Sequence, residues 1–116
     1  MAPRLQPIPL AFWRSAGGSE PVRDWLRELD KADREVIGGD LRTLQFGWPL
    51  GMPLARKLVD GVWEVRSTLP SRREARLLFA VDGKQIVVVS GFIKKSQKTP
   101  ATEIALARRR LKDLVS

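Results

Sequence analysis

The sequence contains no cysteine, no histidine and no tyrosine among its 116 residues. The absence of cysteine excludes disulfides and thiolate chemistry. The absence of histidine removes the usual general base near neutral pH and the commonest zinc ligand. Any acid–base chemistry must therefore use lysine, arginine, a carboxylate, a hydroxyl group or water.

Long apolar stretches are also missing. Apolar runs such as residues 86–89 are far shorter than the roughly 20 residues that a membrane-spanning helix needs. The proline-rich residues 1–9 lack the apolar segment of a secretory signal. We therefore expect a soluble protein of the cytoplasm.

Positive charge is in excess, and it is unevenly distributed. The chain has 21 lysines and arginines against 13 acidic residues, which gives a net charge of +8. Residues 1–53 hold seven basic and seven acidic residues, residues 54–83 hold six and four, and residues 84–116 hold eight and two. A basic C-terminal part is typical of a surface that binds nucleic acid or an acidic protein. The alternative is a surface whose charge only keeps the protein soluble.

The length and the apolar fraction of 43% are ordinary for one globular domain. No internal repeat and no low-complexity tract is visible. We expect residues 1–116 to form a single domain.

Two helices are predicted in the N-terminal half. Apolar residues recur at helical spacing over residues 22–29 and again over residues 36–44. Ser19 is the expected N-cap of the first helix, and Asp30 or Asp33 that of the second.

Alternating patterns replace the helical spacing after residue 61. Strands are predicted over residues 62–69, 75–81 and 84–92, with a hairpin turn at Asp82 and Gly83. The last of these strands has an unbroken apolar centre, which indicates a position near the middle of the sheet.

The predicted fold class is α+β. A short strand over residues 8–14 opens the chain, and a last helix is expected to start with Thr99 as its N-cap and Pro100 at its first position. The expected order is β-α-α-β-β-β-α, with two N-terminal helices packed on an antiparallel sheet and a C-terminal helix.

Basic side chains are expected to gather on the strand face opposite the core. Arg66 and Arg76 lie on neighbouring strands of this face, and their planar donor groups can converge on one phosphate. Lys94, Lys95 and Lys98 follow the last strand. Any one of these residues is explained by a solvent-exposed strand face, whereas the cluster, which coincides with the charge excess, favours a function.

Other residues flank this cluster and, together with Lys94, are candidates for binding RNA. Lys57 precedes the strands, Arg73 lies in the turn between two of them, and Phe92 is placed to stack on a base. Trp25 and Trp63 lie on apolar stripes and are expected in the core, whereas Trp48 is expected to be freer.

The scattered carboxylates do not suggest a metal site, and no cofactor is expected. Cleavage of a phosphodiester without a metal favours RNA, because the RNA supplies its own 2′-hydroxyl as the nucleophile. Arginine and lysine can neutralise the phosphate. A lysine whose pKa is lowered by neighbouring cations can transfer a proton.

Four blocks of sequence, in this order, resemble the phage-derived Gp49-like branch of HigB toxins, which belongs to the RelE/ParE superfamily. They are residues 57–66 (KLVDGVWEVR), 76–79 (RLLF), 91–100 (GFIKKSQKTP) and 103–108 (EIALAR). The segment over residues 21–29 resembles the first helix of the same family.

The resemblance implies a RelE-like fold and the toxin of a type II toxin–antitoxin system. The implied activity is that of a metal-independent endoribonuclease, an mRNA interferase that cleaves mRNA in the ribosomal A site and leaves a 2′,3′-cyclic phosphate. The implied partner is a HigA-type antitoxin with a helix-turn-helix domain. We expect the toxin to be monomeric alone and hetero-oligomeric with the antitoxin.

The resemblance also implies roles for single residues. Arg66 matches the basic position on the strand that carries the tryptophan, and Arg76 matches the phosphate-clamping arginine. Lys95 matches the basic residue at the end of the last strand. RelE-like relatives often have a tyrosine or histidine near the C-terminus, and Lys98 is the expected catalytic substitute. Glu64 stands where RelE has a basic residue, so this part of the charge pattern is not kept.

Two other functions remain open on this fold, because the fold alone does not decide function. One is a non-catalytic, ParE-like inhibitor of DNA gyrase. The other is a decayed phage protein that only binds its partner. The lysine-rich segment favours the nuclease, and the missing histidine and tyrosine favour the decayed protein.

Overall fold

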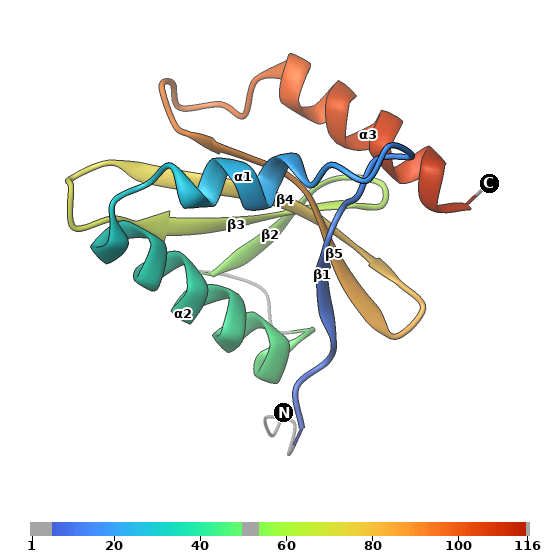
Figure 1. Cartoon of the computed structure of the whole chain (residues 1–116), viewed down its shortest axis with the longest axis horizontal. Coiled ribbons are helices and arrows are strands. Elements are labelled where there is room, and N and C mark those ends of the chain that lie inside the picture. The colour runs from blue at the N-terminus through green and yellow to red at the C-terminus, as the bar shows by residue number, and fades with distance from the viewer. Residues whose placement is uncertain (1–5, 50–53, 116) are drawn as a thin grey trace.

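The computed structural model describes residues 6–49 and 54–115. None of the helices in this part of the chain is long and apolar enough to cross a membrane. The described residues form five strands and three helices (Figure 1), in the order β1 (Leu10–Phe12), α1 (Pro21–Arg27), α2 (Lys31–Gly47), β2 (Ala55–Val59), β3 (Val62–Thr68), β4 (Glu74–Asp82), β5 (Gln85–Ile93) and α3 (Ala101–Val115).

The strands form one sheet in the order β1-β5-β4-β3-β2. Each strand from β2 to β4 pairs antiparallel with the strand that follows it in the chain, whereas β1 pairs with β5 in parallel. The prediction of a purely antiparallel sheet is therefore wrong at this edge. The long connection between β1 and β5 has no hairpin to impose opposite directions. The prediction of an interior position for the last strand is confirmed, because β5 has a neighbour on each side.

Strand β2 is the second difference from the predicted order. Residues 55–59 carry two adjacent charges and no strict alternation, so periodicity alone does not predict a strand there. It forms because β2 and β3 make a hairpin through Asp60 and Gly61, with Gly61 at a φ of 80°. This is the same dipeptide as in the predicted turn between β4 and β5, so a local signal for β2 was present.

Both faces of the sheet are covered (Figure 1). Helices α1 and α2 pack on one face and form the larger core, in which the buried helical residues are Val22, Leu26, Ile37, Leu41 and Leu44. Helix α3 packs on the other face, where Ala107 is buried among Val62, Leu78 and Val89. The strand face that the sequence predicts to be wet is therefore partly covered by α3. This second core explains why β4 and β5 carry apolar residues on both sides.

The predicted helix N-caps have mixed outcomes. The prediction for α1 is wrong, because Glu20 is its N-cap and the Ser19 hydroxyl instead forms a hydrogen bond of 2.8 Å with that of Ser15. Asp30, one of the two residues predicted for α2, is its N-cap but makes no side-chain cap hydrogen bond. Thr99 precedes α3, and its hydroxyl donates to the Glu64 carboxylate. The last contact ties the segment before α3 to the middle of β3.

Candidate functional site

The strand register aligns the predicted arginines. Arg66 on β3 is the partner of Arg76 on β4, and Arg76 is the partner of Phe92 on β5. On the other side of β3, Arg56 of β2 is the partner of Glu64. Partner residues project from the same face of a sheet, so three arginines surround one glutamate beside α3.

Glu64 is the centre of this arrangement, with no exposed surface. Arg76 Nη1 donates to both carboxylate oxygens, at 3.1 and 3.2 Å. Arg56 Nε lies 3.2 Å and Arg66 Nε 3.5 Å from Oε1, and Thr99 donates to Oε2. We call Arg56, Glu64, Arg66, Arg76 and Thr99 the Glu64 cluster.

Burial by itself raises the pKa of the Glu64 carboxyl. The hydrogen bond from Thr99 and the charge of Arg76 outweigh that effect, so the pKa of Glu64 lies below its ordinary value. The carboxylate is thus ionised near neutral pH and makes a poor general base. Its role in the cluster is to hold cations in place.

Arg76 lies beneath the surface, with 2% of its area exposed. Its Nε donates to Glu74 Oε2 at 2.6 Å, while Nη1 is engaged by Glu64. Two carboxylates therefore balance its charge. A phosphate could form a two-point contact with the Arg76 guanidinium only by displacing these carboxylates. The side chains of Arg66 and Arg56, in contrast, are about one-third exposed.

The segment from Lys94 to Thr99 is attached to the cluster at both ends. Lys94 Nζ lies 3.8 Å from Glu74, the carboxylate that also binds Arg76. Thr99 contacts Glu64 at the other end. Lys95 and Lys98, between these anchors, are exposed. The structure therefore attaches the segment that carries the predicted lysines to the two carboxylates that bind Arg76.

Two predicted RNA-binding residues do not join this cluster. Lys57 is the register partner of Trp63, which packs against the α1 and α2 core, so Lys57 belongs to the opposite face of the sheet. Its ammonium group lies 3.4 Å from Asp60. Arg73 Nη2 donates to Asp33 Oδ2 at 3.3 Å and ties the β3–β4 turn to α2.

Arg56 and Thr99 are cluster members that the sequence prediction missed. The sequence prediction expected Lys57 beside the cluster, whereas the structure has its neighbour Arg56 there. A one-residue difference reverses the face of a strand residue, and the face could not be assigned while β2 was unrecognised. Thr99 was interpreted as a helix cap, because local spacing does not show that Glu64 lies opposite it.

The aromatic predictions have mixed outcomes. Trp25 and Trp63 pack against the larger core, as expected. Trp48 does so too, with its ring centroid 4.9 Å from that of Trp63, so the expectation that Trp48 is freer is wrong. Phe92 is partly buried and packs against the α3 core. It also lines a cavity of about 430 Å³ beside the lysine segment.

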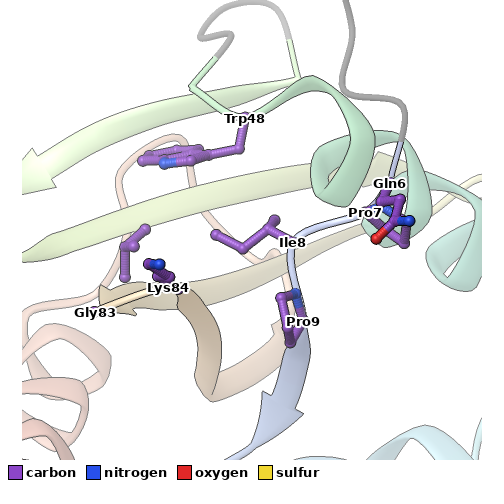
Figure 2. Close-up of a pocket in the computed structure, with 8 residues that line it drawn as sticks. Gln6, Pro7, Ile8, Pro9, Trp48, Gly83 and Lys84 are labelled. Atoms are coloured by element: carbon purple, nitrogen blue, oxygen red, sulfur yellow. The ribbon is translucent and has the colours of Figure 1, made fainter.

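A second cavity, of about 540 Å³, lies at the other end of β4 and β5. Figure 2 shows it between Ile8, Trp48 and the β4–β5 turn at Lys84. It contains none of the predicted site residues. In the described part of the chain, no group of three carboxylates is arranged to hold a metal ion.

The fold is of the α+β class, with three helices and a five-stranded mixed sheet, and it is consistent in general with the RelE-like fold. The order of its elements differs somewhat from the predicted one. Residues 24–112 match the family described as "Phage derived protein Gp49-like (DUF891)". The chain belongs to this family, which is related to the toxins of toxin–antitoxin systems. A search of curated proteins gives no match.

Proposed function

We propose that the protein is the toxin of a type II toxin–antitoxin system and, in the manner of HigB, cleaves mRNA on the ribosome. The Glu64 cluster is the observation that carries this proposal. It holds two partly exposed arginines, and through Thr99 it is attached to the segment that carries the exposed Lys95 and Lys98, on a protein whose family is related to such toxins. These cations form a surface suited to an RNA phosphate.

The burial of each side chain suggests a division of roles. Arg66 and Arg56, with 32% and 37% of their side chains exposed, can each turn a donor toward a phosphate while Glu64 orients the guanidinium. Lys95 and Lys98 approach from the attached segment. Arg76 is a positioning residue in this proposal, because it holds Glu64 and has only 2% of its area exposed.

The proposed step needs no group beyond the RNA and these side chains. The ribose 2′-oxygen attacks the adjacent phosphorus and loses its proton to water or to a nearby base. The bond from phosphorus to the 5′-oxygen breaks, and the products are a 2′,3′-cyclic phosphate and a free 5′-hydroxyl. Lys98 is the proposed donor of the proton to that 5′-oxygen. Arg66 and Lys95 stabilise the extra negative charge on the phosphate.

A HigA-type antitoxin with a helix-turn-helix domain is the proposed partner. The net charge of +8 makes an antitoxin with an acidic toxin-binding segment the natural complement. Such a segment would compete with RNA for the exposed cations of the site.

A ParE-like inhibitor of DNA gyrase is the second candidate. It is favoured by one observation, namely that two carboxylates neutralise Arg76, which is the buried cation in the described part of the chain. A basic surface of this kind can also bind a protein or DNA without catalysis.

Induction of the protein in cells, followed by mapping of transcript 5′ ends, separates the two candidates. The nuclease predicts new 5′ ends inside translated codons, and their loss in Arg66→Ala and Lys98→Ala. Lys31→Ala, an exposed residue of α2 on the other face, is the matched control and should cleave like the parent. Loss of DNA supercoiling with intact transcripts would overturn the nuclease and support the gyrase inhibitor.

A further inference from the structure

The cavity beside the lysine segment lies at an open part of the sheet edge. Strand β1 pairs with β5 only as far as Val88, and the cavity begins three residues further on, at Gly91. Trp25 of α1 bounds it on one side, and Pro100 and Glu103, at the start of α3, bound it on the other. Its volume of about 430 Å³ is within the range of small-molecule sites, about 300–1,000 Å³.

Gly91 sets the shape of the cavity. A Cβ atom at this position would lie 2.7 Å from Trp25 Cζ3 and 2.8 Å from Cε3, closer than atoms can pack. The absence of a side chain therefore lets the indole lie directly against β5. With Phe92 on the neighbouring position, the cavity has two aromatic residues in its wall. Aromatic rings are the surfaces on which unpaired bases stack.

Glu103 supplies a fixed acceptor. Its Oε1 accepts a hydrogen bond of 2.6 Å from the hydroxyl of Ser90, which is buried on β5. Among the described residues, no donor is found on the other oxygen, Oε2. The Glu103 carboxylate lines the cavity, and the hydrogen bond from Ser90 holds it in one orientation.

The cavity adjoins the Glu64 cluster along two paths. Phe92 in its wall is the register partner of Arg76, and Pro100 in its wall follows Thr99, which binds Glu64. Lys95, an exposed cation, lines the cavity as well. A nucleotide whose phosphate lies on the cluster could therefore place its base in the cavity.

We infer that this cavity binds the base of a nucleotide next to the cleaved phosphate, and that Glu103 selects guanine. This inference rests on the proposed function. An ionised carboxylate only accepts hydrogen bonds. Guanine presents two adjacent donors on its Watson–Crick edge, N1–H and the N2 amino group, whereas the other bases present an acceptor beside their single donor group. The two oxygens of Glu103 can therefore accept from both of these guanine donors, whereas with any other base one oxygen faces an acceptor and is repelled.

Nuclear magnetic resonance titration of the full chain with the four ribonucleoside 3′-monophosphates tests the inference. The Gly91 amide and the Trp25 indole N–H report on the cavity. We expect guanosine monophosphate to shift both and to bind about tenfold or more tightly than the other three, as hydrogen bonds to a charged group allow. Equal binding of all four would overturn the selectivity, and no shift at these two probes with any nucleotide would overturn the site.

Glu103→Gln is the discriminating variant, since the amide keeps the size of the side chain and replaces one acceptor by a donor. We expect it to lose the guanine preference about tenfold while still folding. Glu35→Gln, at an exposed position of α2, is the matched control and should keep the preference. An unchanged preference in Glu103→Gln would contradict the assignment. Absence of RNA cleavage by the parent protein would instead count against the proposed function, and the titration reads nucleotide binding without any cleavage.

Discussion

At the scale of single residues, Glu64 decides how the charges of the site are arranged. It is buried with three arginines and a hydroxyl around it, and it is the only carboxylate among the described residues that contacts all three. Removing its charge leaves Arg76 buried with one carboxylate instead of two. Loss of one partner of a buried ion pair costs about 3–5 kcal/mol. We expect Glu64→Gln to lower the free energy of unfolding by roughly 3 kcal/mol at neutral pH, measured by urea denaturation.

The pH dependence of the same variant gives an independent check. Because the folded-state pKa of Glu64 is lowered, its contribution to stability is present above its unfolded pKa of about 4.3 and is lost as the pH falls through the folded value. Below about pH 4, the parent should therefore lose stability more steeply than Glu64→Gln. Glu35→Gln, an exposed control, should keep the parent's slope. Parallel profiles for the parent and Glu64→Gln would contradict the central role of Glu64.

At the scale of elements, the contact between α1 and β5 depends on one glycine. Gly91→Ala would force a methyl group into the Trp25 ring, and such overpacking typically costs about 1–3 kcal/mol. We expect thermal unfolding about 4–8 °C lower per kcal/mol lost in a domain of this size class. Gly38→Ala, at an exposed position of α2 with open space around the new methyl group, is the control and should raise stability by up to about 1 kcal/mol. Equal effects of the two substitutions would contradict this description of the contact.

The helices and strands also show how much of the fold can be predicted from the sequence. Strong periodicity predicted α1, α2, α3 and the three long strands, and it placed Arg66 and Arg76 on one face. Periodicity missed β2, whose residues do not alternate, and therefore did not show on which faces of the sheet Lys57 and Arg56 lie. It also predicted that the face carrying Arg66 and Arg76 is exposed to solvent. The cover by α3, the burial of Arg76 and the contact from Thr99 to Glu64 are tertiary, so no local pattern encodes them.

At the scale of the whole molecule, the excess of positive charge bears on the proposed association with RNA. The last third of the chain carries eight basic and two acidic residues, and α3 adds Arg108, Arg109 and Lys112 to the exposed cations. Each phosphate contact with a single strand contributes about −0.7 to the slope of log affinity against log salt. Lys95→Ala should therefore make the slope about 0.7 less steep in fluorescence anisotropy with single-stranded RNA. Lys31→Ala should leave the slope unchanged, and an unchanged slope in Lys95→Ala would remove Lys95 from the RNA-binding surface.

The most direct test of the nuclease proposal is cleavage by the purified protein on ribosomes programmed with a defined mRNA. We predict a cut within the A-site codon, with a 2′,3′-cyclic phosphate on the upstream fragment. Arg66→Ala and Lys98→Ala should slow the single-turnover rate by about a hundredfold or more while unfolding like the parent. An intact mRNA with the parent protein, or full rates in both variants, would contradict the proposal.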